Sequence, residues 1–252
     1  MKVGIFDSGL GGLTVLKELL KVSKGIEFYY LGDTARVPYG IRSEETVKRY
    51  ALECTLFLKE FDIDLLVIAC NTASAKAGAF LRKKFPELPI FDVIEPAVEE
   101  ILNLNPQSVG VIGTPSTVGS KVYKEKLLKR KSNIKILQRA TPLLVPLVEE
   151  GFLKGPITET VLRHYLSDWK DKIEVLLLGC THYPLLKEEI KRLFPDWVIV
   201  DSAQPLAKGL KPLLQREGNN KVHLFFTDKT AFLERMLTSI GLKEKRIKIV
   251  KW

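Results

Sequence analysis

Residues 65–72 read LLVIACNT, an unbroken aliphatic run that ends in a cysteine and two small polar residues. A short continuous apolar run of this kind is typical of a strand that is buried on both faces of a parallel sheet. Similar runs recur along the 252 residues, and longer amphipathic stretches separate them, for example at 44–61, 73–85 and 184–194. This alternation predicts an α/β fold with mainly parallel sheets that are flanked by helices.

Polar and small residues directly follow most of the predicted strands. The predicted strands are Val3–Phe6, Ile26–Leu31, Leu65–Ala69, Val109–Ile112, Ile134–Leu137, Val175–Leu178, Val198–Val200, Val222–Phe226 and Ile247–Val250. The polar segments are Asp7-Ser8-Gly9, GDTARVPYG at 32–40, Cys70-Asn71-Thr72, GTPST at 113–117 and GCTH at 179–182. In a parallel sheet, ligands bind beyond the carboxyl ends of the strands. Hydroxyls, amides and backbone N–H groups gathered there predict a site for a carboxylate ligand.

Charge and composition narrow the class of protein. The net charge of +9 would suit a nucleic-acid binder, but Lys alternates with Glu at 124–126 and 187–189, as on solvated helix faces. We therefore expect no specific nucleic-acid partner. The first residues lack the pattern of a signal peptide, and no run approaches the length of a membrane span, so we expect no membrane association. Three cysteines exclude a full disulfide framework, and reduced thiols in the cytoplasm are the expectation.

Two pairs of segments resemble each other inside the chain. VGIFDSGLGGLTVLKELL begins at Val3 and VGVIGTPSTVGSKVYKEKLL begins at Val109, and each has the pattern of a strand, a polar turn and an amphipathic helix. FDIDLLVIACNTA and DKIEVLLLGCTHY pair Cys70 with Cys180 at nearly the same separation along the chain. Two matches at nearly one spacing predict two related α/β halves that face each other.

Cys70 and Cys180 allow several chemical interpretations. With His182 they could supply three ligands of a catalytic zinc, although the chain has no C-x-x-C or H-E-x-x-H pattern. A disulfide between them is geometrically possible but is disfavoured in the cytoplasm. Cys180 with His182 could act as an acyl-transfer nucleophile, which leaves Cys70 without a role.

A further interpretation uses both thiols. Two cysteines at matching places in facing halves would flank one substrate, so that one thiolate removes a proton from a carbon centre and the other thiol returns a proton to the opposite face. A free thiol is mostly protonated at neutral pH, so each cysteine needs a neighbour that accepts or orients its proton. Asp7 and His182 are the candidates for that assistance.

Several of these residues also have purely structural interpretations. The glycine-rich stretch DSGLGG at 7–12 fits neither the G-x-x-x-x-G-K-[ST] nor the G-x-G-x-x-G pattern of phosphate-binding loops. Asp7 or Ser8 could cap a helix, and Glu149 could be a charge at a helix end. Cys54 lies within an amphipathic stretch and is predicted to fill the core.

Five motifs, FDSGLGG, GDTARVPYG, ACNTAS, IEP and GCTHYP, resemble in this order those of glutamate racemases and span nearly the whole chain. The resemblance implies cofactor-independent interconversion of L- and D-glutamate by two bases, with D-glutamate going to peptidoglycan synthesis. It implies acid/base roles for Cys70 and Cys180, with Asp7, His182 and Glu149 as helpers, and no metal. The implied substrate-binding residues are Asp7, Ser8, Tyr39, Gly40, Asn71, Thr72, Thr114, Thr117, Thr181 and His182.

The resemblance also implies two pseudo-symmetric α/β domains with the active site at their interface. The first domain would comprise residues 1–93 and 205–252, and the second would comprise residues 94–204. The chain would cross between them near 94–96 and 201–202, which are candidate hinges for closing the site. A homodimer is a further expectation. An aspartate racemase is the near alternative, and a two-lobed binding protein for a small anion is the alternative from another class.

Overall fold

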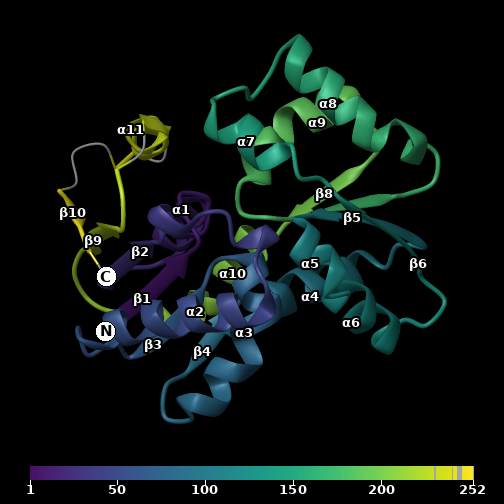
Figure 1. Cartoon of the computed structure of the whole chain (residues 1–252). Helices are drawn as coiled ribbons and strands as arrows, with labels where there is room; N and C mark the ends of the chain where they lie inside the picture. The colour runs from purple at the N-terminus through teal and green to yellow at the C-terminus, as the bar shows by residue number, and fades with distance from the viewer. Residues whose placement is uncertain (230, 240, 243–245, 252) are drawn as a thin grey trace.

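The computed structural model describes residues 1–229, 231–239, 241–242 and 246–251, and its strands form two sheets (Figure 1). The first sheet, in the order β10-β9-β2-β1-β3-β4, contains β1 (Lys2–Asp7), β2 (Glu27–Gly32), β3 (Leu65–Ile68), β4 (Ile90–Asp92), β9 (Lys221–Phe226) and β10 (Ile247–Ile249). The second sheet, in the order β6-β5-β7-β8, contains β5 (Ser108–Gly113), β6 (Lys135–Ala140), β7 (Val175–Gly179) and β8 (Val198–Asp201). All neighbouring strands are parallel, as predicted.

The two sheets repeat one strand order. The order β2-β1-β3-β4 in the first sheet corresponds to β6-β5-β7-β8 in the second, and β9 and β10 extend only the first sheet. β1 and β5 carry the first pair of matching sequence segments, whereas β3 and β7 carry the second pair. The fold therefore confirms the two related α/β halves that the sequence predicts.

Helices cover both faces of each sheet (Figure 1). On the first sheet, one face carries α2 (Glu44–Lys59) and α3 (Asn71–Lys84), and the other carries α1 (Leu13–Val22) and α10 (Ala203–Leu210). On the second sheet, one face carries α4 (Ile94–Leu104) and α6 (Val122–Arg130), and the other carries α7 (Leu144–Glu149), α8 (Pro156–Leu166) and α9 (Lys187–Leu193). The remaining helices are α5 (Pro115–Gly119) and α11 (Ala231–Ser239). Within the described ranges, no helix has both the length and the apolar character needed to cross a membrane.

Apolar side chains from both sheets meet in one continuous core. Val3 and Ile5 of β1 belong to the same buried cluster as Leu176 and Leu178 of β7. Burying one such aliphatic side chain stabilises a fold by about 1.5–3 kcal/mol. The two halves are therefore joined by a shared hydrophobic interior as well as by the chain.

The strand registers bring the predicted polar segments to one edge of each sheet. Phe6 of β1 pairs with Ile68 of β3, so the residues that follow these two strands lie close together. Gly113 of β5 pairs with Gly179 of β7, which brings the GTPST and GCTH segments together in the same way. These carboxyl ends are the places where parallel sheets bind ligands.

The chain crosses between the sheets after β4 and after β8, and the two crossovers are built alike. Asp92 Oδ1 accepts the backbone N–H of Ile94 at 2.8 Å, at the start of α4. Asp201 Oδ1 accepts the backbone N–H of Ala203 at 2.9 Å, at the start of α10. Each crossover thus has a strand-end aspartate that caps the next helix. The domain boundaries at 93/94 and 204/205 lie beside these crossovers and stay a prediction.

The structure differs from the predicted elements at two places. The strand β4 was not predicted, because it has only three residues at the sheet edge and two of them are half-buried, which leaves little aliphatic pattern. The helix predicted at 184–194 begins as a 3₁₀ turn at Tyr183–Leu186 and only then continues as α9. Proline in the first turn of that segment lacks the N–H that a longer helix would use.

Candidate active site

A small cavity of about 20 Å³ lies between the carboxyl ends of the two sheets. Cys70 lines it from the first half and Cys180 from the second, and both are free thiols that are only 5% and 6% exposed. The other predicted site residues that line it are Ser8, Tyr39, Gly40, Asn71, Thr72, Thr114, Thr181 and His182. The predicted residues outside the lining are Asp7, Thr117 and Glu149. Because both cysteines are free thiols, the disulfide interpretation is wrong, and the two thiols share one cavity.

Cys70 lies between the end of β3 and the first turn of α3. Its sulfur accepts the backbone N–H of Ala73 at 3.5 Å, and its thiol donates to Ser8 Oγ at 3.5 Å. Burial and then the nearby charge of Asp7 raise the pKa of the Cys70 thiol to about 12. Cys70 is therefore protonated at neutral pH and is placed to donate a proton.

Cys180 has different neighbours. Its sulfur lies 3.8 Å from Nδ1 of His182, and Nε2 of the same ring lies 3.1 Å from Glu149 Oε1 at the end of α7. Burial alone would lower the pKa of His182, but the interactions with Cys180 and Glu149 outweigh it and raise the pKa to about 10. His182 therefore holds a proton beside the Cys180 sulfur at neutral pH.

Asp7 ends β1 and is completely buried. Its Oδ2 accepts the backbone N–H of Gly9 at 2.9 Å, and its Oδ1 accepts the hydroxyl of Thr181 at 3.2 Å. Burial raises the pKa of Asp7, although the charge of His182 and these hydrogen bonds act in the opposite direction. Asp7 thus influences Cys70 through its charge, while its hydrogen bonds reach the residue next to Cys180.

Three threonine hydroxyls form a cluster between the two halves. Thr72 Oγ1 lies 2.9 Å from Thr114 Oγ1 and 3.1 Å from Thr117 Oγ1. The Thr114 hydroxyl also accepts the backbone N–H of Thr117 at 3.2 Å, which caps α5. Because hydroxyls can donate as well as accept, this cluster is suited to a carboxylate ligand. Thr117 supports the cluster from behind the cavity lining.

Tyr39 and Gly40 form a wall of the cavity in the loop after β2. The Tyr39 hydroxyl donates to Asp33 Oδ2, so a ligand would meet its ring or backbone. A Cβ atom at Gly40 would lie 2.4 Å from Thr114 Cβ, a separation that real Cβ contacts do not show. Glycine at this position therefore lets the loop approach the second half of the molecule.

Asn71 lines the cavity, but its side-chain amide already has protein partners. Nδ2 donates to the hydroxyl of Tyr123 at 2.7 Å and to Ser202 Oγ at 3.3 Å. A ligand would therefore meet the backbone N–H groups at the start of α3, where helices commonly bind anions.

Two glycines have a role that the sequence analysis missed. A Cβ atom at Gly11 would lie 2.4 Å from Thr181 Oγ1 and 2.6 Å from His182 Nδ1, and one at Gly12 would lie 2.4 Å from Asp7 Cβ. The turn after β1 is thus glycine-rich because it packs closely against the Cys180 segment. The repeated glycines of DSGLGG are the signal in the sequence for this close packing, although their spacing fits no phosphate-binding loop.

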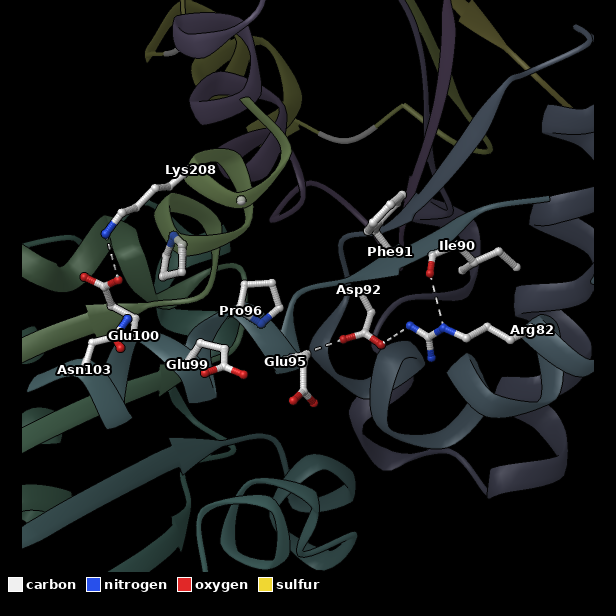
Figure 2. A pocket seen from close by; sticks show the side chains of 12 residues that line it. Arg82, Ile90, Phe91, Asp92, Glu95, Pro96, Glu99, Glu100, Asn103 and Lys208 are labelled. Atoms are coloured by element: carbon white, nitrogen blue, oxygen red, sulfur yellow. Dashed lines mark hydrogen bonds and ion pairs between the residues drawn. The ribbon is translucent and has the colours of Figure 1, made fainter. Parts of the chain in front are cut away.

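A wider hollow lies beside the crossovers (Figure 2). Its acidic residues already have basic partners: Asp92 pairs with Arg82 at 2.5 Å, and Glu100 pairs with Lys208 at 3.4 Å. Neither thiol lines this hollow. Among the described residues, no group of three or more His, Cys, Asp or Glu side chains could hold a metal ion. The thiol cavity is therefore the candidate active site.

Comparisons with known proteins agree with this geometry. Residues 13–209 match the Asp/Glu/Hydantoin racemase family. The chain is 49% identical over 250 residues to the glutamate racemase of Aquifex aeolicus, across 99% of this chain and 97% of that protein. The chain belongs to the glutamate racemases of this family. It is therefore an amino-acid racemase, which is a kind of isomerase, and the family predicted from the five motifs is confirmed.

Solved structures of glutamate racemases share the whole fold. The enzyme of Francisella tularensis, in complex with D-glutamate, has a TM-score of 0.92 at 34% identity, over 99% of this chain and 97% of that one. The enzyme of Aquifex pyrophilus has a TM-score of 0.85 at 48% identity, over 99% of this chain and 98% of that one. The likeness in fold thus extends over both sheets.

Proposed function

We propose that this chain interconverts L- and D-glutamate by a two-base mechanism that needs no cofactor. The observation that carries the proposal is that Cys70 and Cys180, from different sheets, line one cavity as free thiols. A carbon centre held between them would have one sulfur on each face. One thiolate would remove the α-proton, and the other thiol would deliver a proton to the opposite face, which inverts the centre.

The neighbours of the two sulfurs support different routes for the proton. Near Cys70, the carboxylate of Asp7 would help to accept or orient the thiol proton through its charge. Near Cys180, the imidazole of His182 would exchange a proton with the sulfur, and Glu149 would hold that imidazole in place through its 3.1 Å contact. General acid–base groups of this kind typically contribute 10²–10⁴-fold to a rate.

The polar lining of the cavity supports glutamate as the ligand. The D-glutamate complex of the Francisella relative, at 34% identity over nearly the whole chain, points to the same ligand. Hydroxyls and backbone N–H groups would bind its carboxylates, and the buried carboxylate of Asp7 would favour its ammonium group. The proposed binding residues remain Asp7, Ser8, Tyr39, Gly40, Asn71, Thr72, Thr114, Thr117, Thr181 and His182.

The proposed product indicates the metabolic role of the enzyme. D-glutamate would enter peptidoglycan synthesis, so the enzyme would serve cell-wall biogenesis and cell shape from the cytoplasm. A homodimer is the proposed assembly, and no specific nucleic acid or membrane partner is proposed.

Incubation with D₂O tests this function directly. Purified, reduced protein should convert either glutamate enantiomer into its mirror image, with one deuterium at Cα of the product, as measured by optical rotation and proton NMR. Faster conversion of aspartate would instead indicate an aspartate racemase. Glutamate binding that survives thiol alkylation, without exchange or turnover in the untreated protein, would indicate a binding protein.

Replacing Gly11 by alanine should lower kcat/KM for glutamate about 100-fold, because the added methyl group displaces the Thr181 hydroxyl and the His182 ring. Gly209→Ala is the matched control, since a Cβ there meets no atom within 4 Å and lies in α10. Steady-state racemisation rates and unfolding temperatures of both variants provide the comparison. A folded Gly11→Ala variant with the activity of the control would show that the close approach is unnecessary.

A further inference from the structure

The residue that follows each cysteine bonds into the opposite half of the molecule. Asn71 follows Cys70 in the first half, and its amide donates to the hydroxyl of Tyr123 on α6 at 2.7 Å. Thr181 follows Cys180 in the second half, and its carbonyl accepts the hydroxyl of Thr14 on α1 at 3.1 Å. These contacts occupy equivalent places after β3 and β7 in the duplicated fold.

Tyr123 is held firmly for its contact. It is 1% exposed and packs in the cluster of apolar side chains between α4, α6 and the second sheet. It lies in the first turn of α6, two residues after the left-handed residue Lys121 (φ 58°) that precedes the helix. Its ring also lies against the residue before Cys180, since a Cβ at Gly179 would be 3.3 Å from Tyr123 Cε2. One side chain therefore touches the segments of both cysteines.

Thr14 makes the corresponding contact from the other side. Its hydroxyl is buried and also contacts the carbonyl of Gly11 at 2.8 Å. Gly11 is the glycine that packs against Thr181 and His182. The Thr14 hydroxyl thus connects the turn after β1 to the segment of Cys180.

We propose that Tyr123 and Thr14 are positioning residues that set how the two thiols face each other across the cavity. The inference rests on the proposed two-base function. Neither residue lines the cavity, so each acts through the residue that follows a cysteine. Losing the Tyr123 hydroxyl loosens the Cys70 segment alone, whereas losing the Thr14 hydroxyl loosens the Cys180 segment alone.

Two conservative variants separate these effects. Tyr123→Phe keeps the ring against Gly179 and removes only the hydroxyl, and Thr14→Val keeps the branched shape. Each should lower kcat for racemisation about 10-fold or more, because a small misplacement of a reacting group is costly. Unfolding temperatures should fall by only about 3 °C, as expected when one hydrogen bond is lost.

The decisive readout is exchange without inversion in D₂O. A correctly placed thiolate removes the α-proton and becomes a thiol, which trades its proton for solvent deuterium. When the opposite donor is displaced, the same sulfur returns deuterium to the same face, so the recovered starting enantiomer carries deuterium. The ratio of this exchange to inversion should rise at least about threefold over the native enzyme, and in the two variants it should rise for opposite enantiomers.

Matched controls complete the test. Thr14→Ser keeps a hydroxyl at this position and should keep the native ratio of exchange to inversion. Tyr29→Phe removes a tyrosine hydroxyl that donates to Glu27 outside the cavity, and it should also keep the native ratio. The positioning roles would be overturned if Tyr123→Phe and Thr14→Val both kept the native ratio, or if the ratio rose for the same enantiomer in both variants. Racemisation by the native enzyme would still uphold the proposed function in that case. Absence of exchange and racemisation in the native enzyme would overturn both.

Discussion

Replacing either Cys70 or Cys180 by alanine should lower kcat/KM for glutamate racemisation about 1000-fold or more. Each variant retains one thiol on the cavity, so a proton can be removed from one face but no thiol returns it to the other. The remaining thiol should still exchange the α-proton of one enantiomer with solvent. Proton NMR of Cα deuterium measures that exchange separately from inversion, which optical rotation follows.

Cys54 is the matched control for these variants. It is the third free thiol, fully buried among the α2 and α3 side chains, and it is not part of the cavity lining. Cys54→Ala should keep activity within about twofold, while the small void lowers the free energy of unfolding by about 1 kcal/mol. If Cys70→Ala or Cys180→Ala racemises glutamate as fast as this control, the two-base assignment is wrong.

Replacing His182 by asparagine should lower kcat/KM about 100-fold and change its pH dependence. With a pKa of about 10, the native imidazole holds a proton beside Cys180 at neutral pH. Native activity that depends on this proton should fall as the pH rises above about 10. The variant should lack that decline, which rate profiles between about pH 7 and 11 would reveal.

Stability should follow the same titration. Because the pKa of His182 in the folded protein lies above its ordinary value of 6.5, protonation favours folding. This contribution is complete below about pH 6.5 and is lost as the pH rises through about 10. The difference in free energy of unfolding between the native enzyme and His182→Asn should therefore shrink over that interval.

His223→Asn supplies the control for both measurements. His223 contacts Glu27 at 2.8 Å on the first sheet, away from the cavity lining. Its replacement should leave the rate profile unchanged. A His182→Asn variant with the native profile would show that the proton near Cys180 comes from another group.

The position of the thiol pair could be predicted because it depends on short-range pattern. A continuous aliphatic run becomes a buried parallel strand, and the residue after such a strand lies at the ligand-binding edge. That rule places Cys70 and Cys180 without knowledge of any contact. Their separation along the chain is nearly that of the first pair of segments, so the duplication indicates that they face each other.

Contacts between the halves could not be predicted, because strand patterns do not encode how two sheets face each other. The sequence suggests that Asp7 assists a thiol, but not that it accepts the hydroxyl of Thr181. From the sequence, the side-chain amide of Asn71 is expected to bind the substrate, whereas in the structure it donates hydrogen bonds to Tyr123 and Ser202. Gly11 belongs to a stretch that fits no phosphate-binding pattern, and its close packing against the Cys180 segment is seen only in the structure.

The duplicated fold surrounds its two sulfurs unequally, since Cys70 contacts a serine hydroxyl and Cys180 contacts an imidazole. Two enantiomers have equal free energies in water, so the equilibrium constant of a racemase is unity, and kcat/KM must be identical in both directions. The different neighbours of the two sulfurs can make kcat and KM differ between the enantiomers, but only in proportion, because the ratio is fixed. The enantiomer with the lower KM must therefore also have the lower kcat. Unequal neighbours can therefore change how quickly each enantiomer is processed at saturation, but never which one accumulates.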